Sequence, residues 1–187
     1  MINRIVFVLA ICLFLLSCKS KTPDNRYNSI FIDTSKVDFK IIDSKIINDS
    51  LIVTTSSYIY FPFGYYHNLK DFSEVFPFMN TYNDTIKHLF NFSFKKSSIK
   101  LLFDENNCLQ IVAAKIHDPE IVLYNKVRVG MTKTDFINSY AFQFNSEQIN
   151  KAKVVKMISA ATGIWHYYIF KGDILSYFYF ETDYIIQ

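Results

Sequence analysis

Glycine and proline are scarce in this sequence, with four of each among 187 residues. A site that cradles phosphate with backbone amides depends on a glycine-rich loop, and the sequence contains neither such a loop nor a Gly-x-Ser-x-Gly nucleophile elbow. The scarcity therefore argues against a nucleotide-binding site. It also argues against a disordered chain, which is typically rich in proline, glycine and polar residues.

Residues with the spacing of metal ligands are also missing. No two of the four histidines have a spacing such as His-x-x-x-His, and Cys108 has no nearby cysteine partner. The acidic stretch from Asp104 to Asn107 lacks the Asp-x-Asp-x-Asp-Gly pattern of a calcium loop and is typical of a solvated turn. The sequence predicts no metal and no cofactor. The four histidines are His67, His88, His117 and His166.

The one long apolar run lies at the N-terminus, from Ile5 to Leu16, directly after Arg4. Its 12 residues would span about 18 Å as a helix, which is short of the ~30 Å hydrocarbon core of a bilayer. No other run approaches 18 apolar residues, so no transmembrane helix is expected. The pattern predicts a signal peptide over residues 1–17.

The apolar run ends in Leu15-Leu16-Ser17-Cys18. This ending resembles the lipobox of bacterial lipoproteins, and the resemblance implies cleavage between Ser17 and Cys18. It also implies a diacylglycerol on the Cys18 sulfur and an acyl chain on its amine. Two or more chains anchor a protein stably, at about 0.8 kcal/mol per buried CH₂. The alternative is an ordinary secretory signal in which Cys18 has no such role.

The residues after Cys18 indicate to which membrane the protein is sorted. In enteric bacteria an aspartate at the next position signals retention in the inner membrane, but here that position is Lys19. Residues 19–24 also lack the acidic run that marks surface-exposed lipoproteins in some bacteria. We therefore expect an outer-membrane protein that faces the periplasm. Residues 18–28 are polar, contain Pro23, and are predicted to form a flexible tether.

Cleavage after Ser17 would leave 170 of the 187 residues, enough for one domain or two small packed units. The net charge of +3 would fall to +2 with the loss of Arg4. No concentrated basic stripe is present, so no nucleic-acid partner is expected. Cys12 would be removed and Cys18 lipidated, which leaves Cys108 without a partner for an internal disulfide. We expect Cys108 to be a buried apolar residue.

Aromatic residues are abundant, with 19 phenylalanines and 13 tyrosines, which favours a strand-rich core. Residues 29–48 are predicted to form N-terminal strands. Around residues 126–136 the pattern predicts a strand, a glycine turn and a helix start. Val127 and Val129 alternate with a polar residue, Gly130 allows a sharp exit, and Thr132 with Asp135 resembles a capping box.

A similar pattern occurs 64 residues earlier. Asn68 is a candidate helix cap with Asp71 three residues later, as Thr132 is with Asp135. Aromatic hairpin strands follow both helix starts. The repeat predicts two divergent units, residues 49–117 and 118–187, unless the likeness is due to chance. The expected fold class is α+β, an antiparallel sheet with helices packed on one face, in two tandem strand-helix-strand units.

The Val-Gly-Met-Thr-Lys turn at residues 129–133, with the antiparallel strands and aromatic hairpin that follow, resembles part of a known group of proteins. It is similar to small bacterial outer-membrane assembly lipoproteins and to the β-lactamase-inhibitor-protein-like fold, over Val127 to Phe180. The resemblance implies helices on one face of an antiparallel sheet, often in tandem copies. The first unit departs from it at Tyr65-Tyr66-His67. The composition and lipobox also look like uncharacterised lipoproteins of the Bacteroides type, a resemblance that implies no activity.

Tyrosines are the candidate binding residues. Alternation places Trp165 and Tyr167 on one face of a strand, and places Tyr177 and Tyr179 opposite Phe178 and Phe180. Tyrosine combines contact area with a polar tip, which suits partner surfaces. Either one tyrosine-rich face is free for a partner, or both faces are buried. The candidate partner surface comprises Tyr65, Tyr66, Tyr177 and Tyr179.

These observations favour a non-enzymatic, lipid-anchored envelope protein that binds another envelope protein. A second hypothesis is an inhibitor or immunity protein that blocks an enzyme or toxin with the loop from Gly64 to Asn68. A third is an envelope hydrolase, which would need a cleft where two or more ionisable groups converge.

Overall fold

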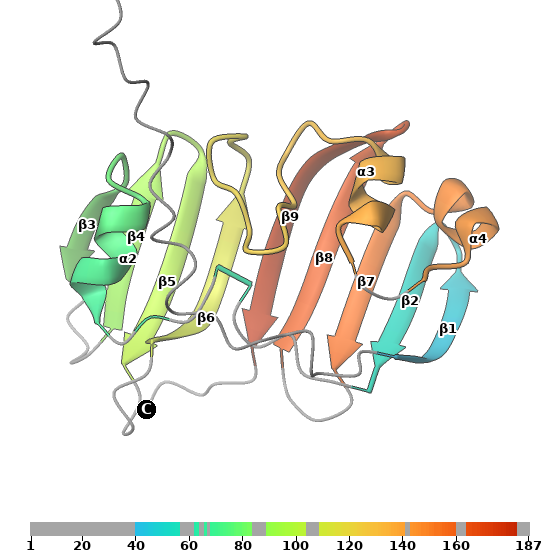
Figure 1. Ribbon diagram of the computed structural model, residues 1–187, viewed down its shortest axis with the longest axis horizontal. Coiled ribbons are helices and arrows are strands. Elements are labelled where there is room, and N and C mark those ends of the chain that lie inside the picture. Colours follow the sequence, from blue (N-terminus) through green and yellow to red (C-terminus); the bar gives the residue numbers. More distant parts are fainter. Residues whose placement is uncertain are drawn as a thin grey trace, which may run out of the picture.

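The computed structural model describes residues 40–56, 62–63, 66, 68–83, 89–103, 109–140, 143–159 and 164–182. Within these ranges nine strands form one mixed sheet in the order β1-β2-β7-β8-β9-β6-β5-β4-β3 (Figure 1). The strands are β1 (Ile41–Ile47), β2 (Ser50–Thr55), β3 (Asn80–Asn83), β4 (Leu89–Phe94), β5 (Ser97–Phe103), β6 (Leu109–Ile116), β7 (Val154–Ser159), β8 (Ile164–Lys171) and β9 (Ile174–Thr182).

The predicted α+β fold of two tandem strand-helix-strand units is wrong. The described helices are α2 (Leu69–Val75), α3 (Lys133–Asn138) and α4 (Ser146–Lys151), each only six or seven residues long, and the sheet dominates the structure. The sheet is also not purely antiparallel, because β2 runs parallel to β7. Separate units would leave strand edges unpaired. Pairing β2 with β7 and β6 with β9 joins those backbone groups in a single sheet.

The three helices lie in front of one face of the sheet (Figure 1). Each contributes a fully buried side chain to the core between helices and sheet, Phe72 from α2, Phe136 from α3 and Ile149 from α4. The sheet contributes alternate residues, such as Phe178 and Phe180 of β9. We call the opposite face, which none of the described helices covers, the open face.

The predicted helix starts are confirmed. The Asn68 side chain accepts a hydrogen bond from the Asp71 backbone N–H at 2.9 Å, and Thr132 accepts from the Asp135 N–H at 3.1 Å. Each cap side chain also donates to the carboxylate of its aspartate, at 2.9 Å in both cases. Helices this short are marginal in isolation, so capping and the burial of one phenylalanine each must hold α2 and α3 in place.

The strand predicted at Val127 to Val129 is wrong. Val127 is fully buried, but its carbonyl accepts from the Leu123 N–H at 2.9 Å, which closes a local turn. The chain then runs beside the first residues of β9, where the Gly130 N–H donates to the Leu175 carbonyl at 2.8 Å and Thr132 forms an antiparallel bridge with Ile174. The alternation therefore reflects a segment that contacts the core from the end of the sheet without joining the ladder.

Gly130 does adopt the predicted left-handed conformation, with φ of +89°. An added Cβ would meet no atom within 4 Å, so a substitution here acts through backbone strain alone. We expect Gly130→Ala to lower the free energy of unfolding by about 1–2 kcal/mol in urea denaturation. Gly172→Asn is the control, because its φ of +62° is one that asparagine adopts readily. Wild-type stability of Gly130→Ala would show that the turn relaxes without cost.

The predicted turns at Asn48-Asp49 and Lys171-Gly172-Asp173 are confirmed, with Asn48 at φ +54°. The turn predicted at Asp104 to Asn107 lies outside the described residues, as does Cys108. Helix α4 and strand β3 were not predicted. Strands β4-β5-β6 and β7-β8-β9 are two consecutive meanders that meet where β6 pairs with β9. The division of the chain at residue 118 stays a prediction.

Candidate functional site

Strands β8 and β9 carry the candidate site on the open face. Along β8 the buried side chains alternate with partly exposed ones, and Trp165 and Tyr167 are on the partly exposed side. Along β9 Tyr177 and Tyr179 are partly exposed, while Phe178 and Phe180 are buried under the helices. The predicted alternation is therefore confirmed. The open face has partly exposed tyrosines where β8 and β9 pair.

Three tyrosines and a histidine stack on this face. The rings of Tyr167 and Tyr179 lie 4.3 Å apart between centroids and within 8° of parallel, and Tyr177 lies 6.4 Å from Tyr179. The His117 ring extends the stack, 4.9 Å from Tyr177. Cross-strand aromatic pairs stabilise a sheet by roughly 0.2–1 kcal/mol each, so the rings are held in place before any partner arrives. We call His117, Tyr177, Tyr179 and Tyr167 the tyrosine row.

The stacking decides what the tyrosine row presents. Since Tyr179 lies between two other rings, a partner meets ring edges and hydroxyl groups more than ring faces. Burial, the charge of Glu181 and the neighbouring tyrosines raise the pKa of Tyr179 above its ordinary value of 10.0. Its phenol therefore stays protonated at neutral pH and can donate a hydrogen bond.

A groove of about 510 Å³ lies beside the tyrosine row. Its lining includes the small side chains Ser98 and Ala113, on strands β5 and β6. Tyr82 of β3 lines one side, and Tyr177 and Tyr179 of β9 line the other. The groove arises because small residues alternate with large ones along neighbouring strands. Its other lining residues include Asn91, Lys100, Lys115 and Glu181.

Lysines outnumber acidic residues on the open face. The strand registers place five lysines and two acidic residues there among the described residues. Lys156 lies 5.0 Å from the Tyr167 ring centroid and 5.5 Å from that of Trp165, which is cation–π geometry. The face therefore combines aromatic edges with positive charge. The lysines are Lys45, Lys100, Lys115, Lys156 and Lys171, and the acidic residues are Asp43 and Glu181.

Tyr66 does not belong to a partner surface, and its prediction is wrong. It is only 7% exposed, its hydroxyl donates to the Phe63 carbonyl at 2.8 Å, and its ring packs edge-on against Phe72. The core formed by α2 buries the ring, which a local pattern of tyrosines could not indicate. Asn68 ends the loop that the inhibitor hypothesis invokes, and its side chain caps α2. Tyr65 lies outside the described residues, as do Ser17 and Cys18.

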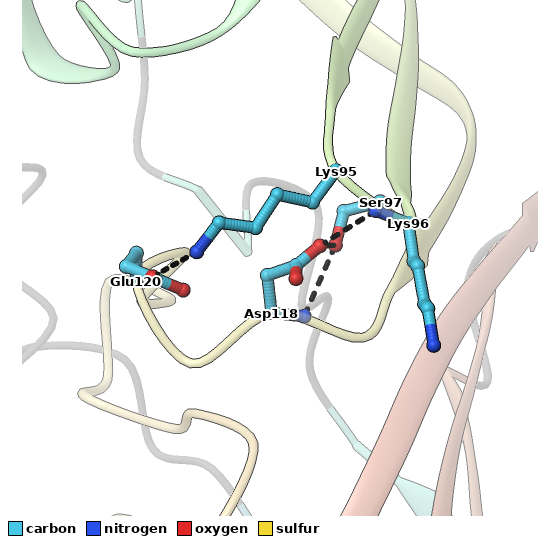
Figure 2. Close-up of polar contacts among 5 residues, drawn as sticks. All are labelled: Lys95, Lys96, Ser97, Asp118 and Glu120. Atoms are coloured by element: carbon cyan, nitrogen blue, oxygen red, sulfur yellow. Dashed lines mark hydrogen bonds and ion pairs between the residues drawn. The ribbon is translucent and has the colours of Figure 1, made fainter.

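A serine and an aspartate form a buried pair next to His117, at one end of the tyrosine row (Figure 2). The Ser97 hydroxyl donates to Asp118 at 2.6 Å and accepts from the backbone N–H groups of His117 and Asp118 at 2.9 and 3.1 Å. The Lys96 N–H donates to the same carboxylate oxygen at 3.1 Å. These bonds occupy the hydroxyl on all sides, so the pair holds the β4–β5 turn against the end of β6. It does not resemble an activated nucleophile.

We call Ser97 and Asp118 with these hydrogen bonds the Ser97–Asp118 lock. An exposed ion pair lies beside it. Lys95 contacts the carboxylate of Glu120 (Figure 2). Its hydrogen bond is the main cause that lowers the pKa of Glu120 below its ordinary value. Exposed pairs of this kind contribute little to stability, because water and salt screen them. The buried serine and aspartate are therefore the important part of the lock.

Replacing Ser97 by alanine should destabilise the fold. The change leaves the Asp118 carboxylate without its closest donor and two backbone N–H groups without their acceptor. We expect the free energy of unfolding to fall by about 2 kcal/mol, since a hydrogen bond to a charged group contributes ~1.5–3 kcal/mol. Urea denaturation measures the change. The control is Ser98→Ala, at the neighbouring exposed serine. If the two variants are equally stable, the hydrogen bonds of Ser97 do not stabilise the fold as proposed.

A second buried polar group was missed by the sequence analysis. The ring of His166, 2% exposed, lies 3.2 Å from the Tyr168 hydroxyl, and the Tyr140 hydroxyl lies 2.8 Å from that of Tyr168. Burial raises the pKa of both tyrosines above 10.0. The His166 ring and the two tyrosine hydroxyls are therefore hydrogen-bonding partners inside the core. The alternation of β8 placed His166 and Tyr168 on the inner face, but nothing in the sequence pointed to Tyr140 as their partner.

Within the described part of the chain, no group of three or more histidine, cysteine, aspartate or glutamate residues could hold a metal ion. None of the helices described is long and apolar enough to cross a membrane. Comparisons of the chain with protein-family models, curated proteins and solved structures found no match. The resemblance to envelope lipoproteins therefore stays an expectation.

Proposed function

We propose that this chain is a lipid-anchored protein of the bacterial envelope that binds another protein through the open face of its sheet. The observation that supports binding is the tyrosine row with its groove, on the face opposite the described helices. The lipobox-like ending at Ser17 and Cys18 supports the anchor. Lys19 and the lack of an acidic run over residues 19–24 support a site at the outer membrane facing the periplasm. The role is one of binding or assembly, without catalysis.

The dimensions of the sheet suit a protein partner. Nine strands spaced ~4.8 Å apart span about 38 Å, and strands of six to eight residues extend about 20–27 Å. The open face therefore offers roughly 800 Å², which is about what one partner contributes to a stable interface. Only its central part needs strong contacts, because a few buried aromatic or arginine side chains carry most of the binding energy.

The tyrosine row suits that central role. Association costs about 0.5–1.5 kcal/mol for each flexible side chain that becomes ordered. The stacking of Tyr177 on Tyr179 and of Tyr179 on Tyr167 has already fixed these rings within the free protein. Their hydroxyls can pair with acceptors on a partner while the ring edges contribute apolar contact.

The double variant Tyr177→Ala/Tyr179→Ala tests this proposal. Chemical crosslinking in intact envelopes, followed by purification of the chain and mass spectrometry, should recover its partner at least tenfold less well from this variant than from wild type. Tyr124→Ala is the matched control. Tyr124 is exposed, and its backbone N–H donates to the Pro62 carbonyl, next to Phe63, which packs against α2 on the helix side of the sheet. Circular dichroism and urea denaturation check that the variants are folded. Unchanged recovery from a folded double variant would refute this surface.

A further inference from the structure

We infer that the groove beside the tyrosine row receives an extended, acidic segment of the partner protein. This inference rests on the proposed function and adds the chemistry of the partner to it. The shape of the groove, the charges around it and the hydrogen-bond donors along one side all favour the same occupant.

The shape favours an extended segment. The groove reaches from Tyr82 on β3 to Tyr179 on β9, across four strand spacings or about 19 Å. Five or six residues of extended chain cover that distance, at about 3.3 Å each. A volume of about 510 Å³ is typical of a site that holds a short segment and its side chains, and is too small for a folded element.

The charges favour acidic side chains. Lys100 and Lys115 line the groove, and Glu181 is the one acidic residue among the described residues that line it, so these residues carry a net positive charge. Lys115 is exposed, and none of the described residues forms an ion pair with it. Lys156 adds a further positive charge at the far end of the tyrosine row. Opposite charges steer association and exclude partners of the wrong sign.

The donors favour carboxylates in particular. Register pairing places Lys115 directly opposite Tyr179, and both residues line the groove, so an ammonium group and a phenol O–H come from neighbouring positions of β6 and β9. A carboxylate accepts hydrogen bonds on both oxygens and can pair with the two at once. A basic side chain in that place would lie beside the like charge of Lys115, and like charges repel.

The full chain, purified in detergent, can be titrated against a fluorescein-labelled octapeptide of alternating glutamate and serine. Fluorescence anisotropy should show saturable binding that weakens at 0.5 M salt, since screening reduces exposed ionic contacts. The same peptide with glutamine in place of glutamate should bind at least tenfold more weakly, and the lysine version should not bind. If the glutamate peptide fails to bind at 1 mM, or the glutamine peptide binds equally well, the inference is wrong.

Lys115→Glu should weaken binding of the glutamate peptide at least tenfold, with Lys115→Gln in between. Lys45→Glu is the control, because Lys45 lies on the open face but on the edge strand β1, away from the groove. The envelope crosslinking experiment separates the two proposals. If Tyr177→Ala/Tyr179→Ala loses the partner and Lys115→Glu keeps it, the surface stands and the acidic segment is refuted. If both variants keep the partner, the proposed function itself fails.

Discussion

Replacing Cys18 by alanine is expected to move the protein out of the membrane fraction or to leave it as an unprocessed precursor. The diacylglycerol of a lipoprotein is attached through the cysteine sulfur, and alanine offers no atom for that bond. Two or more acyl chains contribute about 0.8 kcal/mol per buried CH₂, so their loss removes essentially all membrane affinity. Fractionation of cell envelopes, with mass measurement of the N-terminal peptide, would detect both the release and the missing lipid.

The matched control is Cys108→Ala, which removes a thiol but leaves the lipobox-like ending intact. It should fractionate as wild type does. If the Cys18→Ala variant has lost its signal peptide through processing and still fractionates with the membrane, anchoring at this residue is contradicted. In that case the leader would be an ordinary secretory signal.

The second large effect is expected in the core. Phe136 of α3 is completely buried, and its ring lies 4.7 Å from Tyr168 and 5.4 Å from Phe170, between centroids. Tyr140 and Phe144 pack against it from the helix side, at 5.2 and 5.8 Å. Truncation to alanine should therefore lower the free energy of unfolding by about 3–5 kcal/mol. That is a large part of the ~5–15 kcal/mol that holds a typical domain together.

Urea denaturation followed by circular dichroism measures this loss. Phe78→Ala makes the same chemical change at an exposed phenylalanine and should cost less than ~1 kcal/mol. If Phe136→Ala unfolds at the urea concentration of the wild-type protein, α3 cannot be docked on the sheet as described. A lowered midpoint for Phe136→Ala alone would show that this one ring joins the helix to β8.

The candidate site shows how far local patterns could identify it. Tyr177 and Tyr179 were selected by alternation along a strand, and the structure places both on the open face, where they stack with Tyr167. The groove could not be foreseen, because Tyr82 and Tyr179 come from strands that are nearly a hundred residues apart. Neither could the contribution of Lys115, which depends on the register between β6 and β9.

Features whose causes lie within a few residues could be predicted from the amino-acid sequence. Asn68 with Asp71, and Thr132 with Asp135, cap helices because the bonds span three residues. Gly130 could be identified as a turn residue for the same reason, since its conformation depends on its own missing side chain.

Three features became visible only in the folded chain: the single nine-stranded sheet, the burial of Tyr66, and the hydrogen-bonded series of His166, Tyr168 and Tyr140. Each depends on segments far apart in the chain. β2 pairs with β7 about one hundred residues later, and a local pattern carries no information about which edge a strand will join. That choice minimises unpaired backbone and exposed apolar surface over the whole chain, so it is a property of the assembled fold.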